Sequence, residues 1–300
     1  MVTIEKLLKD GIDIIKQREF NNPLLDVQLI LSYLLEKDRI YLHVHRKEEV
    51  DNVIVQKFYE MAEKRNLGYP LQYMTNSQEF MGLDFFIKEG VLVPRPDTEV
   101  LVEKIINIVQ NSSLKDKNIN ILDIGTGSGA IAVSLGYYLK NSNVTAIDIS
   151  DVAIEIANIN IKRHGLSNVN VIKGDIFNFD FQNQKYDIVV SNPPYIEREV
   201  ISTLPTEVSE FEPKLALDGG EDGLDYYRHI VNTFKNIYEE NAVLSVEIGY
   251  DQKDKVMELF NNTKIFRKVE CTKDLGSNDR VVTGMTYHPF FRLFFLKNGW

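Results

Sequence analysis

The sequence has almost no cysteine and little histidine, and both scarcities narrow its chemistry. The single cysteine, Cys271, cannot form an internal disulfide or a multi-thiolate metal site. The five histidines are scattered and lack the spacing typical of metal ligands. We therefore expect a protein of a reducing compartment that binds no metal.

Long hydrophobic runs are also missing. The first ten residues, MVTIEKLLKD, carry charges and contain no apolar core of a signal peptide. No stretch is long and apolar enough to predict a transmembrane span. These features predict a cytoplasmic protein with no membrane partner.

Basic residues are outnumbered. With 34 Lys and Arg against 44 Asp and Glu, the net charge of −10 argues against a broad nucleic-acid-binding face, although it leaves room for a local basic groove. The chain does have 300 residues of which 44% are hydrophobic, which is enough for a sizeable core in one large domain or two smaller ones.

The first part of the chain has helical periodicity. Apolar residues recur at helical spacing over residues 3–67, and Asn22 followed by Pro23 is a plausible helix start. The pattern then changes to alternation over residues 79–96, as in a β-hairpin that turns at Glu89 and Gly90.

Helical and strand patterns alternate after the hairpin. Strands are predicted at 119–124, 144–148, 169–173, 187–191 and 242–248, with a weaker pair near 265–269 and 280–283. Helices are predicted at about 98–110, 129–140, 151–164, 225–240 and 251–260. Such alternation is typical of an α/β fold with a mostly parallel sheet, helices on both faces and a ligand at the carboxyl ends of the strands.

A glycine-rich turn follows the first of these strands, in ILDIGTGSGAIAVSL. Gly125, Gly127 and Gly129 allow the backbone to turn tightly and to approach a ligand closely. The spacing G-x-G-x-G is one residue shorter than the dinucleotide fingerprint, which favours S-adenosylmethionine over NAD. A purely structural tight turn is the alternative.

Acidic residues follow the next two strands. Asp148 lies near the interval expected for a carboxylate that accepts from ribose hydroxyls, and the alternative role of helix cap suits Ser150 better. Asp175 and Ile176 come after the third strand, where the carboxylate can accept from the adenine amino group and the aliphatic side chain can cover the ring. An ordinary strand-to-loop aspartate is the alternative for Asp175.

The fourth strand ends in the corner Asn192-Pro193-Pro194-Tyr195. A conjugated NH2 nitrogen is a poor nucleophile until fixed acceptors hold its N–H bonds, and the Asn192 side-chain oxygen and the Pro193 carbonyl can be those acceptors. The prolines stiffen the corner, and Tyr195 can cover a flat substrate or exclude water. A loop that merely ends a strand is the alternative. Beside the glycine turn, the corner favours methyl transfer from a sulfonium to an NH2 group.

Several segments together resemble the peptide chain release factor N5-glutamine methyltransferase family (PrmC/HemK). They are PLQYMTNSQEF, VLVPRPDTEVLVE, ILDIGTGSGAIAVSL, AIDISDVAIEIANIN, SNPPYI, VSEFEPKLALDGGEDGLDYYRHI, VEIG and KDLGSNDRVVTG. The resemblance covers nearly the whole chain to residue 284. It implies a protein-glutamine methyltransferase that modifies the glutamine of the release factors' Gly-Gly-Gln tripeptide, and thereby modulates translation termination.

The resemblance also implies a domain plan. A helical N-terminal domain over 1–75, serving to dock the substrate protein, is joined by a β-hairpin linker over 76–97 to a methyltransferase domain over 98–284. That domain is expected to be the seven-stranded Rossmann-like sheet of class I methyltransferases. A Phe-rich tail, 285–300, remains, and it could cap an apolar surface, mediate self-association or stay exposed.

The resemblance also implies which residues of this sequence occupy the family's binding and catalytic positions. The cofactor-binding positions are Gly125, Thr126, Gly127, Ser128, Gly129, Asp148, Ile176 and Asn192. Asp175 is added because of its place after the third strand. The substrate-binding positions are Asn192, Pro193, Pro194 and Tyr195, with Asn192 and Pro193 as the catalytic acceptors. The cofactor is S-adenosyl-L-methionine, the partners are release factors, and no stable nucleic-acid partner is expected.

Other residues keep two interpretations. Arg95, Asp97 and Glu99 can close over the cofactor or simply begin a helix that Asp97 or Thr98 caps. For Glu247, at the end of a strand, pairing with a local donor is favoured over a catalytic role. Asn76 stands where the family usually has glycine, which bears on the turn before the hairpin.

Two rival functions remain open at this point. A nucleic-acid amino-methyltransferase, acting on adenine N6 or guanine N2, would use the same pair of acceptors, although the acidic net charge weighs against it. The second rival is not an enzyme but a module that binds the cofactor without catalysis and uses its helices as a docking scaffold. The presence of Asn192 and both prolines argues against it.

Overall fold

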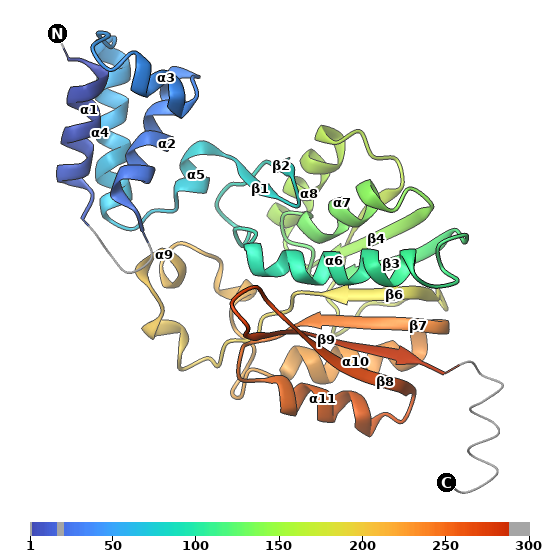
Figure 1. Ribbon diagram of the computed structural model, residues 1–300. Coiled ribbons are helices and arrows are strands. Elements are labelled where there is room, and N and C mark those ends of the chain that lie inside the picture. Colours follow the sequence, from blue (N-terminus) through green and yellow to red (C-terminus); the bar gives the residue numbers. More distant parts are fainter. Residues whose placement is uncertain (1, 17–20, 288–300) are drawn as a thin grey trace, which may run out of the picture. The chain divides into compact units, whose positions relative to one another are not determined.

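The computed structural model describes residues 2–16 and 21–287, which form two compact units (Figure 1). One unit comprises the chain up to Ser77 together with Pro205–Phe211. The other comprises Gln78–Leu204 and the chain from Glu212 on. The chain therefore leaves the second unit and returns to it within the segment that follows the Asn192 corner.

The first unit is helical. Its helices are α1 (Ile4–Ile14), α2 (Pro23–Leu35), α3 (Arg39–Val44), α4 (Asn52–Asn66), α5 (Leu71–Thr75) and, from the returning segment, α9 (Thr206–Ser209). The predicted helix start is confirmed, since Asn22 caps α2 and Pro23 is in its first turn. The short helices α3 and α5 were not predicted because five or six residues are too few to show a period.

A buried arginine binds the returning segment to this unit. Arg65, 5% exposed, donates from Nε to Oδ2 of Asp26 at 2.7 Å and from Nη1 to Oε2 of Glu207 at 2.9 Å. Because both partners are carboxylates, the guanidinium charge is compensated inside the unit. This pairing links α2 and α4 to α9.

A two-stranded hairpin opens the second unit. Strands β1 (Gln78–Phe80) and β2 (Leu83–Phe85) pair antiparallel around Met81 and Gly82, both with positive φ. A turn does lie at Glu89 and Gly90, but no strands flank it, so the predicted hairpin across this turn is wrong. The alternation that suggested it comes from buried side chains of an irregular segment, Ile87, Val91 and Val93. Asn76, φ 52°, ends α5 in a left-handed conformation that asparagine tolerates.

The predicted α/β sheet is confirmed. Its strands are β3 (Ile119–Ile124), β4 (Ser142–Asp148), β5 (Val169–Lys173), β6 (Tyr186–Ser191), β7 (Tyr238–Glu247), β8 (Phe266–Lys273) and β9 (Asp279–Thr286). They lie in the order β5-β4-β3-β6-β7-β9-β8. The five neighbouring strands β5, β4, β3, β6 and β7 pair in parallel, and β9 is antiparallel to its two neighbours, β7 and β8.

Helices cover both faces of the sheet (Figure 1). Helices α6 (Pro96–Gln110), α7 (Ala130–Tyr138) and α8 (Asp151–Arg163) lie on one face, and α10 (Asp225–Ile237) and α11 (Lys253–Asn262) on the other. The helix predicted to run to residue 240 ends at Ile237, because Tyr238 already pairs with Tyr186 in the sheet. Two 3-10 turns, Ile201–Thr203 and Lys214–Ala216, lie in the segment before α10.

The predicted tail begins later than expected. Residues 285 and 286 belong to β9, where Met285 pairs with Val243. The Phe-rich residues 288–300 lie outside the described residues. Within the described part of the chain, no helix is both long and apolar enough to cross a membrane, and no group of three metal-ligating side chains comes together.

Candidate active site

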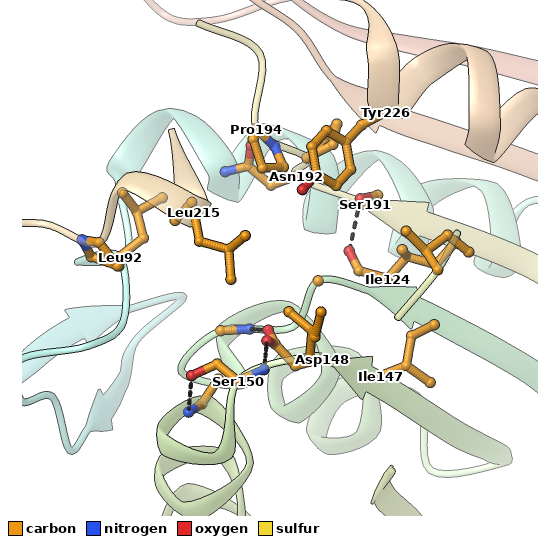
Figure 2. A pocket seen from close by; sticks show the side chains of 18 of the residues that line it. Leu92, Ile124, Ile147, Asp148, Ser150, Ser191, Asn192, Pro194, Leu215 and Tyr226 are labelled. Atoms are coloured by element: carbon orange, nitrogen blue, oxygen red, sulfur yellow. Dashed lines mark hydrogen bonds between the residues drawn. The ribbon is translucent and has the colours of Figure 1, made fainter. Parts of the chain in front are cut away.

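A cavity of about 330 Å³ lies at the carboxyl ends of the parallel strands. Strand β3 lies between β4 and β6, so the strand order reverses beside it, and ligands of α/β sheets bind at such a point. Eight predicted site residues line the cavity: Gly125, Gly127, Asp148, Asp175, Ile176, Asn192, Pro193 and Pro194. Figure 2 shows Asn192, Pro194 and Tyr226 on one side and Asp148 with Ser150 across from them.

The glycine turn is shaped by positive φ angles. Gly125 has φ +72° and Gly127 has φ +55°, and a Cβ at either would meet nothing within 4 Å. Glycine is therefore needed for the backbone conformation, and it leaves an open peptide surface facing the cavity. Gly129 differs, since its Cβ would lie 3.1 Å from Cβ of Ala157, so it allows α7 to pack closely against α8.

The other residues of the turn face away from the cavity, and two of them hydrogen-bond to buried side chains. Thr126 Oγ1 donates to Oδ2 of the buried Asp123 at 2.6 Å, and the Ser128 carbonyl accepts from Asn160 at 2.8 Å. Neither Thr126, Ser128 nor Gly129 lines the cavity. Burial raises the pKa of Asp123 to about 7. The structure thus divides the five predicted loop positions into two that face the cavity and three that hold the loop.

Asp148 faces the cavity and also anchors the glycine turn. Its Oδ2 accepts from the Gly127 amide at 2.8 Å and its Oδ1 from the Ser150 amide at 2.9 Å. Burial raises its pKa, and these amide hydrogen bonds oppose the rise. Each oxygen can accept a further hydrogen bond. Ser150, as expected, caps α8 by accepting from Ala153.

The loop after β5 forms an aromatic wall. Asp175 accepts from the Phe177 amide at 3.0 Å, and Ile176 is buried beside it. Phe177 meets the ring of Tyr226 edge to face with centroids 5.1 Å apart, and both residues line the cavity. Sequence reasoning missed these two, although Phe177 directly follows the predicted Ile176 and Tyr226 lies in the quoted segment GLDYYRHI.

The Asn192 corner presents two oxygens. Nδ2 of Asn192 donates to Oγ1 of Thr98 at 3.2 Å, so the amide oxygen Oδ1 points away from Thr98. Among the described residues, no hydrogen bond engages the carbonyl oxygen of Pro193. Ser191, directly before the corner, connects it to β3, because its hydroxyl donates to the carbonyl of Ile124 at 2.7 Å.

Tyr195 does not line the cavity. Its ring packs against the core cluster around α10, and its hydroxyl lies 3.4 Å from Oε1 of Glu247. Burial, and next the charge of Glu247, raise the pKa of Tyr195. In this structure the Tyr195 side chain therefore packs into the core and anchors the corner, rather than facing the cavity.

Two glycines of the segment GGEDG lie against the same corner. A Cβ on Gly219 would lie 2.8 Å from Cα of Tyr195, and one on Gly223 would lie 2.5 Å from the Tyr195 carbonyl oxygen. Gln252 donates to that same oxygen at 2.8 Å. The preceding residues Pro213, Leu215 and Ala216 line the cavity, so this segment borders the pocket as the resemblance implied.

Three charged residues after the hairpin pair with other segments of the second unit. The cap predicted at Asp97 or Thr98 is wrong, since Arg95 is the N-cap residue of α6 and Pro96 occupies the first turn. Nη2 of Arg95 pairs with Oε2 of Glu212 at 2.7 Å, whereas Asp97 pairs with Arg280 at 3.1 Å. Glu99 accepts from the Met81 amide at 2.6 Å. None of Arg95, Asp97 and Glu99 lines the cavity.

Sequence comparisons agree with this architecture. A family model described as "Methyltransferase domain" matches residues 115–270, and one described as "PrmC N-terminal domain" matches residues 6–75. The release factor glutamine methyltransferase of Clostridium botulinum is 35% identical over 286 residues, which cover 95% of this chain and 99% of that protein. The enzyme of the same name from Clostridium acetobutylicum is 40% identical over 261 residues, covering 86% and 89%.

Solved structures support the fold. The crystal structure of a methyltransferase from Pyrococcus furiosus matches with a TM-score of 0.50 and 19% identity, covering 69% of this chain and 91% of that one. At this identity the likeness concerns the fold alone.

Proposed function

The chain belongs to the release factor glutamine methyltransferase family, and on that basis we propose that it methylates the side-chain amide nitrogen N5 of the glutamine in the Gly-Gly-Gln tripeptide of peptide chain release factors. The methyl donor is S-adenosyl-L-methionine. The release factors are the partner proteins, the reaction modulates translation termination, and the site of action is the cytoplasm.

The cavity residues fit the cofactor. The open glycine backbone at Gly125 and Gly127 gives a ligand close access, and a carboxylate with remaining acceptor capacity, Asp148, lies beside it. Asp175 and the wall of Ile176 and Phe177 suit a flat ring that carries an amino group. These residues would hold the nucleoside part, and the bound cofactor supplies an electrophilic methyl group on a sulfonium.

Two acceptors at the corner suit an amide NH2. The Asn192 side-chain oxygen and the Pro193 carbonyl would each accept one N–H of the glutamine, holding the nitrogen as positive charge develops on it. Methylation would leave the glutamine nitrogen with one proton in excess, and that proton would pass to solvent. The corner contributes position and electrostatic stabilisation, and it needs no general base.

One observation carries this proposal. The hydrogen bond from Asn192 Nδ2 to Thr98 leaves the amide oxygen of Asn192 as the atom available to substrate, on the same cavity as the glycine turn. The opposite amide orientation would present a donor, which cannot hold an N–H group.

The first unit is proposed to dock the release factor. Residues 6–75 match the family's N-terminal domain, and the segment Pro205–Phe211, which follows the corner in the chain, is part of the same unit. This segment therefore connects the proposed docking unit to the corner along the chain.

The test is transfer of labelled methyl from S-adenosylmethionine to a purified release factor. We expect label on the wild-type factor and none on its Gly-Gly-Gln variant with Gln replaced by Ala. Label on the alanine variant, or on adenine or guanine in nucleic acid with the release factor left unmodified, would reject the proposal. In the latter case, binding that falls steeply with salt would identify the nucleic-acid enzyme.

A further inference from the structure

The wall formed by Ile176 and Phe177 separates two cavities. Both residues line the cavity at the strand ends, and both also line a second cavity of about 330 Å³ bordered by the loop after β5 and by α10. Ile176 is buried, whereas Phe177 is 42% exposed. A ring that borders two cavities and solvent has little close packing to fix it, so its position depends on a few directed contacts.

His229 of α10 supplies two of these contacts. Its Nε2 lies 2.9 Å from the carbonyl oxygen of Ile176, and the centroid of its ring lies 4.6 Å from that of Phe177. Because a carbonyl oxygen only accepts, Nε2 carries a proton and donates it. The histidine lines the second cavity and not the first. It therefore contacts the wall from the side that faces away from the proposed cofactor.

Tyr226 of the same helix contacts the wall as well. It lies three residues before His229, so both side chains project from one face of α10. Its ring lies edge to face with Phe177, with centroids 5.1 Å apart, and these are the two ring contacts of Phe177 within the described ranges. The position of the wall is thus set largely by α10.

We propose that His229 is a positioning residue for cofactor binding, which holds Ile176 and Phe177 where the adenine ring of S-adenosylmethionine packs. It touches neither the cofactor nor the substrate. Its effect is exerted through the wall, and this inference rests on the proposed function, which places the nucleoside there.

The effect should appear in affinity and not in turnover. Among the residues that the structure describes, no hydrogen bond or ring contact joins His229 to Asn192 or Pro193. A loosened wall therefore weakens binding of the nucleoside, while the bound cofactor still presents its methyl group to the same pair of acceptors. The Kd and KM for S-adenosylmethionine should rise, and kcat at saturating cofactor should be retained.

His229→Ala removes both contacts. We expect the Kd for S-adenosylmethionine, measured by calorimetry, to rise about tenfold, which is of the order expected for one hydrogen bond and one ring contact. With the release factor as substrate, kcat at saturating cofactor should stay within about twofold of the wild-type value.

Two polar variants isolate the hydrogen bond, and they also decide the question if His229→Ala fails to fold. His229→Gln keeps an N–H donor at about the reach of Nε2, so its Kd should stay within about threefold of the wild-type value. In His229→Asn the amide lies one methylene closer to the backbone, so this variant should bind as weakly as His229→Ala.

His164 offers a matched control. Its Nε2 lies 2.9 Å from the carbonyl oxygen of Asp84, and its ring lies 5.5 Å from that of Phe85 between centroids. These are the same two kinds of contact, made by a histidine that does not line the cofactor cavity. His164→Ala should therefore leave the Kd for S-adenosylmethionine unchanged.

The outcomes separate this inference from the proposed function. A wild-type Kd in His229→Ala, equal affinities of the Gln and Asn variants, an equal rise in Kd in His164→Ala, or a kcat that falls along with the affinity would overturn the positioning role alone. Wild-type protein that binds the cofactor but methylates no release factor would reject the proposed substrate and leave the positioning role standing. Absence of cofactor binding by the wild-type protein would remove both.

Discussion

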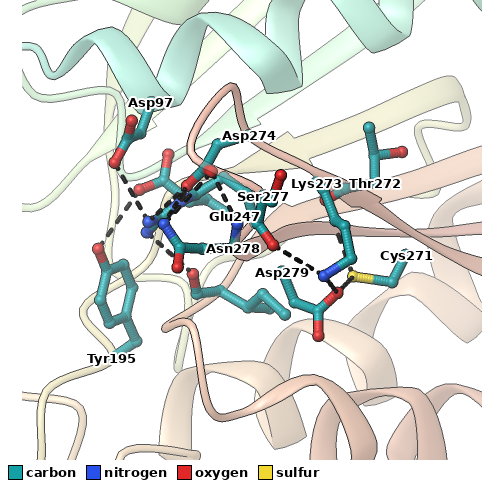
Figure 3. Close-up of polar contacts among 12 residues, drawn as sticks. Asp97, Tyr195, Glu247, Cys271, Thr272, Lys273, Asp274, Ser277, Asn278 and Asp279 are labelled. Carbon is teal, nitrogen blue, oxygen red and sulfur yellow. Dashed lines mark hydrogen bonds and ion pairs between the residues drawn. The ribbon is translucent and has the colours of Figure 1, made fainter.

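Asn192 and Thr98 share a hydrogen bond of 3.2 Å between Nδ2 and Oγ1, which joins the corner after β6 to the first turn of α6. The same contact engages the nitrogen of the Asn192 amide and leaves its oxygen at the other end of the amide group. Figure 3 shows other polar contacts of the second unit, among them the hydrogen bond between the Tyr195 hydroxyl and Glu247.

The first prediction concerns Asn192 itself. Asn192→Ala removes one of the two acceptors proposed to hold the amide NH2, so kcat should fall by a factor on the order of 10² or more. Binding of S-adenosylmethionine, measured by calorimetry, should be largely retained because the glycine turn and Asp148 remain. Asn158→Ala, an exposed asparagine on α8, is the control. Normal kcat in Asn192→Ala would disprove the mechanism.

The second prediction separates cofactor binding from catalysis. Asp148→Asn loses the charge and one of the acceptors that hold the Gly127 and Ser150 amides, so the Kd for S-adenosylmethionine should rise by about one to two orders of magnitude, a loss of roughly 1.5 to 3 kcal/mol. Asp151→Asn is a nearby control, since its carboxylate is exposed and pairs with Lys173. Equal affinities of the two variants would exclude Asp148 from the cofactor site.

The sheet was predictable from sequence because its signals are local. Strands β3 and β5 have the predicted bounds, since each is an apolar run ended by turn-forming residues. The hairpin was predicted too late in the sequence because buried side chains in an irregular segment imitate strand alternation. The glycine at position 82, between the two short strands, was the better sequence signal for the turn.

The site was predictable only in part. Residues directly after strands, such as Asp148 and Asn192, reach the cavity because the topology brings strand ends together. The inward packing of Tyr195 against Glu247 and the hydrogen bond between Asn192 and Thr98 depend on contacts between segments far apart in the chain. Periodicity and motif spacing carry no information on such contacts.

The third prediction is a dependence of stability on pH. Burial raises the folded pKa of Glu247 from 4.5 to about 7, so its neutral form is favoured in the folded state. The resulting stabilisation is fully present below the unfolded pKa and is lost as the pH rises through the folded pKa. Between about pH 5 and pH 8, the wild type should therefore lose about 2 to 3 kcal/mol of unfolding free energy relative to Glu247→Gln. Parallel pH profiles of the two proteins in chemical denaturation would contradict this.

The fourth prediction tests the packing behind the corner. A Cβ on Gly219 would lie 2.8 Å from Cα of Tyr195 and 2.9 Å from the Pro194 carbonyl oxygen, and both are backbone atoms that cannot move aside without shifting the corner. Gly219→Ala should therefore lower kcat by about tenfold or more, because small displacements of a positioning group are costly. Gly165→Ala is the matched control, since its Cβ would meet nothing within 4 Å and only its φ of +62° is strained. It should lower the melting temperature with little change in kcat. If Gly219→Ala instead lost only stability while kcat stayed normal, the corner would tolerate displacement, and precise placement of its acceptors could not be the source of catalysis.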